Sequence, residues 1–189
     1  MHIAKKGLRV LGIAESFSSR KESVLAGIVM RKDLRIDGAA YGTATVGGMD
    51  ATDTIVKLYH SLDRNDINVI MISGCVISWY NIIDPGEVAT RVKRPVIAVT
   101  YEDSEGLEED IMRHFPGDTT RLEMYRKLGS RASIDLPTGY TIYIRTWGLS
   151  EHDAGRLCRE FTYDGKIPEP LRVARICARG VMRYTNGSK

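Results

Sequence analysis

Cysteine is scarce in this sequence. The 189 residues include three cysteines, which are widely separated and form no CxxC pair: Cys75, Cys158 and Cys177. This pattern argues against a disulfide framework and against a zinc site, and it favours a reducing compartment. We therefore interpret all three as small buried hydrophobic residues, which is how free cysteine usually behaves.

Long apolar runs are also missing. No segment approaches the roughly 20 apolar residues that span a bilayer, and residues 1–7 contain no small-residue cleavage site. The hydrophobic fraction of 43% is ordinary for a globular protein. We expect a cytoplasmic protein without membrane contact. The length suits one domain over residues 1–189.

Three short, mostly apolar segments open the chain, at residues 8–14, 24–30 and 39–45. Their patterns predict strands, and the short links between them predict an antiparallel meander. Asp37-Gly38 is suited to a tight turn or a bulge within it.

Helices and strands alternate in the next part of the chain. The segment 47–53, which begins with a glycine pair, leads into a helix that Asp50 or Thr52 can cap. Apolar runs at 67–72 and 95–100 predict buried strands with a helix between them. This order implies parallel pairing with right-handed crossovers.

A later strand at 140–147 and two closing helices complete the pattern. We predict an α/β fold with a mixed sheet, in which three antiparallel strands precede parallel ones and helices flank the sheet. This order of elements resembles the core of RNase H-like nucleases.

Acidic residues follow several of these strands: Glu15, Asp50, Asp53, Asp84 and Glu102. Two-metal phosphodiester hydrolysis needs carboxylates that hold cations about 4 Å apart, and oxygen ligands suit Mg²⁺. Glu15, Asp50 and Asp53 are the best candidates, with Asp84 and Glu102 as outer candidates. Of these, we expect Glu15 and Asp50 to be the metal ligands and catalytic groups. The structural alternatives are a surface acid at a strand end for Glu15 and a helix-start group for Asp50.

The predicted C-terminal helix carries an arginine stripe. The net charge of +3 permits an acidic partner without demanding one, so the distribution of charge is more informative. Four side chains fall within an arc of about 80°: Arg172, Arg175, Arg179 and Arg183. Guanidinium groups match phosphates, so the stripe predicts a nucleic-acid contact. The alternative is a helix packed on the sheet with a solvated basic edge.

Ser73-Gly74 ends the fourth predicted strand, and Trp79-Tyr80 follows shortly after. The carboxyl end of a parallel strand is a favoured place for a site. Aromatic rings stack on bases, so Trp79 and Tyr80 are candidate nucleic-acid contacts. An aromatic pair in such a place is more often part of the core.

Four segments give the chain a resemblance to a known family: 47–54, 81–84, 95–99 and 167–174. In their order along the chain, they resemble an uncharacterised, mainly archaeal family, domain-of-unknown-function family ninety-nine. That family is itself similar to endonuclease V, in the RNase H-like superfamily. The resemblance covers most of the chain, and its last segment is similar to the C-terminal proline–arginine–alanine signature of endonuclease V.

The resemblance implies a metal site that this sequence keeps only in part. The family usually has two acids where this chain has Ala14 and Glu15, and Asp-Gly where it has Ser73-Gly74. The first- and fourth-strand aspartates of endonuclease V bind its metal, so both matching positions have lost their acid. Glu15 points to the opposite face from Ala14 unless a bulge or the strand's end turns it inward.

Three hypotheses follow. We favour a nucleic-acid-binding relative of endonuclease V, with DNA or RNA as partner, whose magnesium-dependent cleavage is weakened or lost. The second hypothesis is an active magnesium-dependent endonuclease on damaged or deaminated strands, with Glu15 and Asp50 as ligands. The third is a non-enzymatic assembly or regulatory subunit, for which salt and arginine charge would matter little. The sequence leaves the oligomeric state open.

Overall fold

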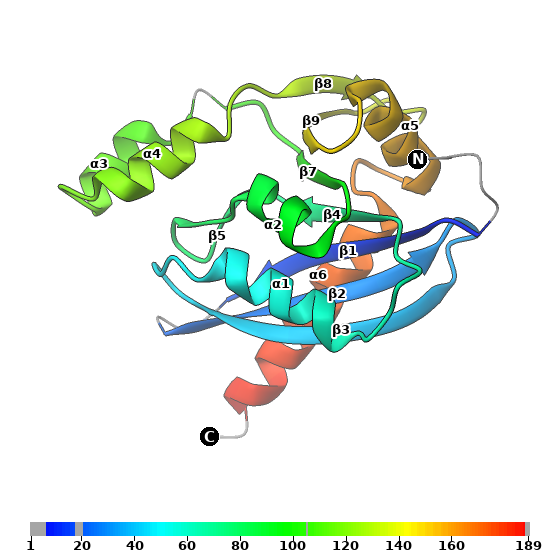
Figure 1. The fold of residues 1–189 in the computed structure, drawn as a ribbon, viewed down its shortest axis with the longest axis horizontal. Coiled ribbons are helices and arrows are strands. Elements are labelled where there is room, and N and C mark those ends of the chain that lie inside the picture. Colours follow the sequence, from blue (N-terminus) through cyan, green and yellow to red (C-terminus); the bar gives the residue numbers. More distant parts are fainter. Residues whose placement is uncertain (1–6, 18–20, 105, 188–189) are drawn as a thin grey trace.

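A computed structural model describes residues 7–17, 21–104 and 106–187 (Figure 1). Residues 1–6, on which part of the N-terminal interpretation rests, lie outside this description. The strands of the main sheet are β1 (Arg9–Ser16), β2 (Glu22–Arg31), β3 (Ile36–Thr45), β4 (Val69–Ser73), β7 (Val96–Thr100), β8 (Ala132–Asp135) and β9 (Thr141–Trp147).

The sheet runs in the order β3-β2-β1-β4-β7-β9-β8. β1, β2 and β3 pair antiparallel, whereas β4 pairs parallel to both β1 and β7. The predicted mixed sheet is therefore confirmed. The far edge adds something that the sequence did not predict, because β9 runs antiparallel to β7 and the short β8 pairs antiparallel with β9.

Asp37 forms a bulge in the meander. Val29 pairs with Gly38 and Met30 pairs with Ile36, so Asp37 is an extra residue on β3. Its carboxylate accepts hydrogen bonds from Arg9 and Arg64, which fix the bulge. Of the two conformations predicted for Asp37-Gly38, the structure contains the bulge.

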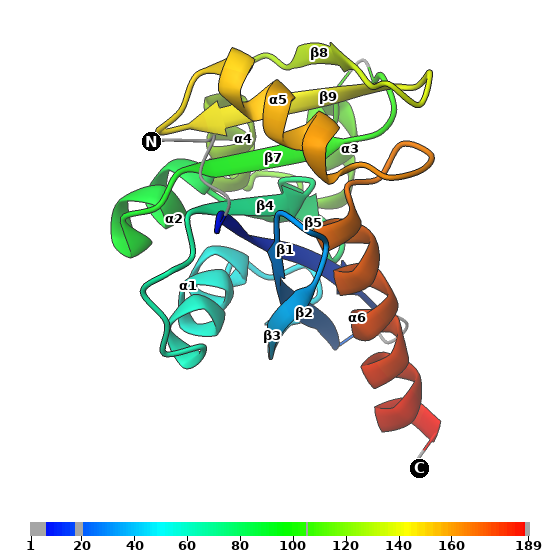
Figure 2. The same ribbon diagram turned by 90° about the vertical axis from the view of Figure 1, so that its right-hand side faces the viewer.

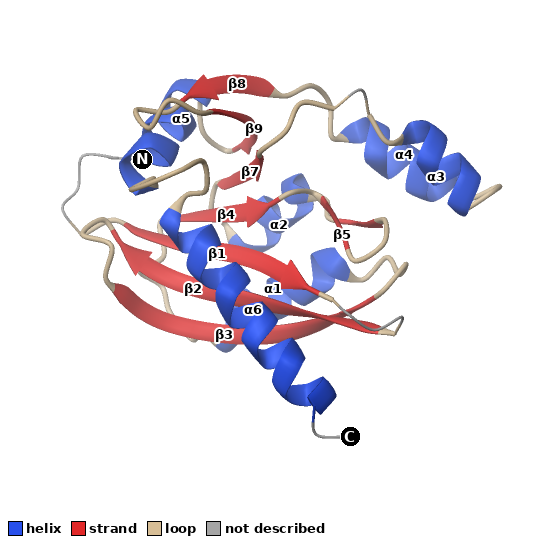
Figure 3. Ribbon diagram, turned by 180° about the vertical axis from the view of Figure 1, so that it is seen from behind, coloured by secondary structure: helices blue, strands red, loops and turns tan. Residues whose placement is uncertain are grey.

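Helices cover both faces of the sheet. They are α1 (Ala51–Ser61), α2 (Pro85–Val92), α3 (Glu108–His114), α4 (Thr119–Lys127), α5 (Glu151–Phe161) and α6 (Glu169–Gly187). α1 and α2 pack on one face, and α5 and α6 pack on the other (Figures 1 and 3). No helix of the described residues is long and apolar enough to cross a membrane.

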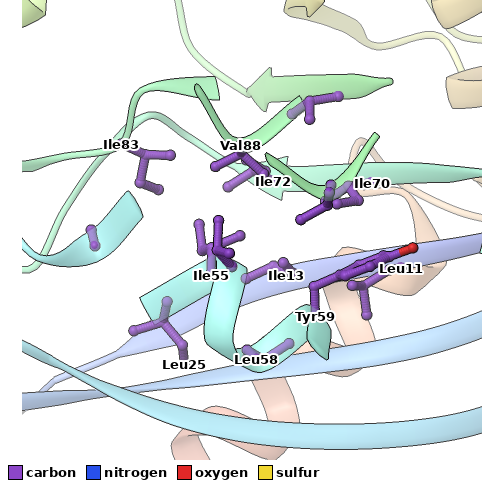
Figure 4. Close-up of a cluster of buried hydrophobic side chains, with 14 of the residues drawn as sticks. Leu11, Ile13, Leu25, Ile55, Leu58, Tyr59, Ile70, Ile72, Ile83 and Val88 are labelled. Carbon is purple, nitrogen blue, oxygen red and sulfur yellow. The ribbon is translucent and has the colours of Figure 1, made fainter. Parts of the chain in front are cut away.

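Apolar side chains fill the space between the sheet and the two pairs of helices. Figure 4 shows Ile13 and Ile70 of the sheet against Ile55 and Tyr59 of α1. Val10 and Met71 face the other way, toward α5 and α6. This alternation assigns each residue of β1 and β4 to one of the two faces.

Helix α6 lies unusually close to β1. A side chain on Gly12 would place its Cβ 2.5 Å from the backbone of Pro170, so only glycine permits this crossing. Figures 2 and 3 show α6 passing over β1 and β2 and extending beyond the sheet. The first turn of α6 is thereby held over the middle of β1, and Arg175, further along the helix, reaches Ser73 at the end of β4.

A two-stranded hairpin follows β4, with β5 (Val76–Ile77) and β6 (Asn81–Ile82). The sequence did not predict this hairpin or α4. Both are short, and α4 has no strong apolar face, so neither produces a clear periodic pattern.

Candidate nucleic-acid interface

The carboxyl ends of three parallel strands meet at one edge of the sheet. Glu15 lies near the end of β1, Ser73 ends β4, and Tyr101 follows β7. Ile13 pairs with Ile72, which places Ala14 and Ser73 at the same level on neighbouring strands. This edge of a parallel sheet is where ligands most often bind.

Ala14 and Ser73 both face α6. Ala14 is 4% exposed and packs with Ala174 of α6 and Ile28 of β2. Ser73 contacts Arg175 of α6, whose Nη2 donates to Ser73 Oγ at 3.4 Å. The two positions at which the family resemblance implies metal-binding acids therefore lie side by side, and neither bears a carboxylate.

A small polar cluster surrounds Ser73. Ser73 Oγ and Tyr101 Oη lie 3.3 Å apart, and the guanidinium carbon of Arg175 lies 5.5 Å from the centre of the Tyr101 ring. Burial raises the pKa of Tyr101, so its hydroxyl keeps its proton at neutral pH. We call Ser73, Tyr101 and Arg175 the edge cluster.

Glu15 lies on the opposite face from Ala14. The β1–β2 register is regular through Glu15, so no bulge turns its side chain toward α6. Instead the carboxylate accepts from the backbone N–H and the hydroxyl of Ser78, each at 3.4 Å. Burial raises the pKa of Glu15, against the opposing effects of the Ser78 hydrogen bonds and the positive charge of Arg175.

Asp50 is the last residue of the loop 46–50 that precedes α1, called the glycine loop here, and it is bound by residues of β3 and β6. It occupies the N-cap position, but its side chain does not cap the helix, which corrects the prediction for this residue. The carboxylate accepts from the N–H of Thr45 at 3.1 Å and from Asn81 Nδ2 at 2.7 Å. Burial would raise the pKa of Asp50, but the hydrogen bonds from Asn81 and Thr45 outweigh it and lower this pKa. Thr52, the other predicted cap, instead accepts from the N–H of Asp84.

The carboxylates of this region do not form a metal-binding group. No three Asp, Glu, His or Cys residues of the described chain come together in a way that could hold a metal ion. Glu15 and Asp50 bind different partners. Asp53 forms an ion pair with Arg91, and the outer candidates Asp84 and Glu102 form ion pairs with Lys127 and Lys166, respectively. At the α6 face, the donor set is a hydroxyl, a phenol and a guanidinium, which does not suit a divalent cation.

The hairpin turn between β5 and β6 has an unusual backbone. Ser78, Trp79 and Tyr80 have φ values of 45°, 59° and 61°, so three successive non-glycine residues are left-handed. Each such residue is strained, and strain of this kind clusters at functional sites. Trp79 is 48% exposed, and its ring lies 4.8 Å from that of His114. The turn therefore presents Trp79 at the surface rather than in the core.

Arg121 of α4 binds the backbone of this turn, and its side chain is 4% exposed. It donates to the backbone carbonyls of Gly47, Gly48 and Tyr80, and its guanidinium carbon lies 3.9 Å from the centre of the Phe115 ring. It thereby joins the glycine loop to the hairpin. The sequence did not identify Arg121 because nothing in α4 distinguishes it from a solvated arginine.

Asn81 was also missed. Its side chain is fully buried, and its Oδ1 accepts from the N–H of Ala51 at 3.1 Å, so it caps α1 in place of Asp50. The only sequence signal for Asn81 was its place in the segment 81–84, which contributes to the family resemblance. That resemblance did not indicate that Asn81 caps a helix.

The arginine stripe is divided by its contacts. Arg172 donates to Glu169 in an ion pair, and Arg175 belongs to the edge cluster. Arg179 and Arg183 are exposed, on the stretch of α6 where Ala178 and Met182 pack on β2. The stripe therefore runs from the end of β4 across β2.

A cavity of about 580 Å³ opens beside the end of β4. Its lining includes Gly74, Thr100, Arg131, Tyr143 and Arg145. The guanidinium of Arg131 lies 5.0 Å from the centre of the Tyr143 ring, and Arg145 Nε donates to the carbonyl of Gly129. The cavity combines aromatic and cationic groups next to the Ser73-Gly74 strand end.

Solved structures with the same fold include several nucleases. A protein of unknown function from Archaeoglobus fulgidus is 27% identical, with a TM-score of 0.79, and the match covers 93% of this chain and 98% of that one. Human ENDOV matches at 16% identity and a TM-score of 0.68, over 95% of this chain and 86% of that one. Endonuclease V of Ciona intestinalis, in complex with DNA containing an inosine followed by a ribo-adenosine, matches at 13% identity and a TM-score of 0.64, over 95% and 88%.

Some proteins related by sequence have a higher identity to this chain than these solved structures have. A UPF0215 protein of Pyrobaculum calidifontis is 44% identical over 179 residues, covering 92% of this chain and 97% of the relative. The model of the endonuclease dU family matches residues 6–182. The chain belongs to the endonuclease dU family and has an endonuclease V-like fold.

Proposed function

We propose that this protein binds nucleic acid and that its magnesium-dependent cleavage is weakened or lost. The observation that carries the proposal is the pair Ala14 and Ser73, which lie level on neighbouring strands and face α6, where Arg175 contacts Ser73 and neither residue supplies a carboxylate. A cation cannot be held there by a methyl group and a hydroxyl alone. A phosphate, in contrast, is well matched by a guanidinium.

Three surface features support nucleic acid as the partner. Arg175, Arg179 and Arg183 form a cationic line along α6 that starts at the strand ends. Trp79 offers an exposed ring on which a base can stack. The cavity of about 580 Å³ beside Gly74 has room for an extruded nucleotide. The Ciona enzyme of the same fold was solved with inosine-containing DNA. A deaminated strand is therefore the first substrate to test.

The test is a fluorescence-anisotropy titration with single- and double-stranded oligonucleotides over a salt series, with and without Mg²⁺. Products from the same samples are separated on a denaturing gel. We expect salt-dependent binding without cleavage, because the contacts are mainly to phosphates. Replacing Trp79 with alanine should weaken single-strand binding about tenfold, as expected for the loss of one stacked base. Tyr163→Ala removes an even more exposed aromatic, just after α5, and serves as the control.

An active nuclease is the second candidate, because Asp50 remains as a carboxylate whose low pKa keeps it charged. Cleavage that requires Mg²⁺ and disappears in Asp50→Ala would establish this function and refute the first. Absence of binding under every condition would refute both and would favour an assembly or regulatory role.

A further inference from the structure

Arg175 differs from three other cations near the edge of the sheet, each of which pairs with a carboxylate. Lys166 pairs with Glu102, Arg172 pairs with Glu169, and Arg131 pairs with Asp103. Among the residues that the structure describes, no carboxylate forms an ion pair with Arg175. The nearest acid that influences it, Glu15, is bound to Ser78 on the other face of β1.

The edge cluster has more hydrogen-bond donors than acceptors. Arg175 brings five N–H donors and no acceptor, and one of these N–H groups reaches Ser73 Oγ. Ser73 and Tyr101 share one hydrogen bond, which leaves the second hydroxyl proton free to donate. A ligand group that only accepts hydrogen bonds and carries negative charge would complete the cluster. A phosphodiester oxygen is such a group.

The position of the cluster also favours a polyanion over a small anion. Arg179 and Arg183 follow Arg175 at intervals of four residues, which is about 6 Å along a helix. Both are exposed. A chain of phosphates can therefore contact the cluster at one end and continue along α6.

We infer that Ser73, Tyr101 and Arg175 form a phosphodiester-binding site in which the guanidinium supplies the positive charge that a divalent cation would otherwise bring. This inference rests on the proposed function and sharpens it: the site binds one backbone phosphate without metal. Ala14 contributes by being small and uncharged, so no carboxylate at this position competes for Arg175. The fork of the guanidinium and the two hydroxyls act on the same phosphate.

A double-mutant cycle tests this cooperation. The probe is a fluorescein-labelled single-stranded oligonucleotide, titrated in EDTA and in Mg²⁺ with the full-length protein. We expect the wild type to bind no more tightly in Mg²⁺ than in EDTA, because Mg²⁺ only competes for the phosphates. Arg175→Ala should bind about tenfold more weakly than the wild type, and Ser73→Ala about threefold more weakly. The double variant should be little weaker than Arg175→Ala, because Ser73 has lost the group with which it acts.

Two comparisons separate the site from general electrostatics. Arg179→Ala and Ser73→Ala should weaken binding independently, so that their effects multiply. Arg156→Ala, on the outer face of α5, should bind as the wild type does. Arg175→Lys keeps the charge but not the fork, and it should recover only part of the affinity. It also provides a measurement if Arg175→Ala does not fold.

The outcomes distinguish a failure of the phosphodiester site from a failure of nucleic-acid binding as a whole. If the wild type binds but Arg175→Ala matches Arg156→Ala, or if the Ser73 and Arg175 effects multiply, the site is refuted and nucleic-acid binding stands. Tightening of wild-type binding by Mg²⁺ would also refute a site in which arginine replaces the cation. If the wild type binds no oligonucleotide, the proposed function fails and the site fails with it.

Discussion

The two faces of the sheet edge contrast sharply. On the face covered by α1, the carboxylate of Glu15 accepts from Ser78 of the hairpin turn, and that of Asp50 accepts from Thr45 and Asn81. On the face covered by α6, Ala14 and Ser73 stand where carboxylates are expected, and the guanidinium of Arg175 contacts Ser73 at the end of β4. The acids therefore hold loops together where they remain, and positive charge occupies the place where acids would bind a metal.

This contrast shows that the number of acids near a strand end is a poor guide to metal chemistry. Glu15 and Ala14 are adjacent in sequence, but the pleat sends their side chains to opposite faces. A shift by one position changes the neighbours of a carboxylate completely. Substitutions of single side chains on either face should therefore weaken or reverse the contrast between the two faces.

The largest effect is expected from Arg121→Ala, on the α1 face. This change removes a buried guanidinium that joins the carbonyls of Gly47, Gly48 and Tyr80, and it leaves those acceptors unpaired. We expect a loss of about 3–5 kcal/mol in the free energy of unfolding and a fall in Tm of roughly 10 °C. Thermal denaturation followed by circular dichroism measures it.

Arg126→Ala is the matched control, because Arg126 lies on the same helix and makes an exposed ion pair with Glu108. It should change the free energy of unfolding by less than about 1 kcal/mol. Equal losses in the two variants would show that Arg121 does not hold the two loops together.

The next effect concerns the α6 face, where Ala14→Asp and Ser73→Asp together would restore two carboxylates at one level. We expect Mg²⁺ to stabilise this double variant by about 1–3 kcal/mol through selective binding to the folded state, which raises Tm by roughly 3–6 °C. Mg²⁺ should leave the wild type unchanged. Ser73→Asp alone is the control. Its single carboxylate would pair with Arg175, so Mg²⁺ should not stabilise this variant. A double variant that does not respond to Mg²⁺ would mean that the α6 face lacks the geometry for a cation.

The smallest effect is the opposite pH dependence of the two carboxylates. The pKa of Glu15 is raised above its ordinary value of 4.5, so its contribution to stability is present below that value and is lost as the pH rises through the raised pKa. The pKa of Asp50 is lowered below 3.8, so its contribution is present above that value and is lost as the pH falls through the lowered pKa.

Two variants separate these contributions. The two variants should depart from the wild type in opposite parts of the range from about pH 2 to about pH 7. Glu15→Gln should gain stability relative to the wild type as the pH rises above 4.5, whereas Asp50→Asn should be less stable than the wild type above 3.8 and should approach it as the pH falls below that value. Each change should be about 1 kcal/mol or less. Tm measured across this range gives both differences, and parallel curves for the two variants would contradict the assignment of the carboxylates to different environments.

Much of the fold followed from local patterns in the sequence. The apolar runs at 67–72 and 95–100 correspond to β4 and β7, and the three opening segments form the predicted meander. These elements were predictable because a strand buried on both faces needs a continuous apolar run. The antiparallel edge of β8 and β9 was not, because strand direction there depends on how the chain returns from α4.

The candidate site shows a similar division. The sequence alone determined that two expected acids are replaced by Ala14 and Ser73 and that α6 carries a line of arginines, because residue identity and helical period require no partner. Only the tertiary structure decided that Arg175 meets Ser73, that Glu15 binds Ser78, and that Arg121 is buried. Arg175 and Ser73 are 102 positions apart in the sequence, and Glu15 and Ser78 are 63 apart. Arg121 and Gly48 are 73 apart. Such pairings are set by the packing of helices on the sheet, and no local pattern encodes them.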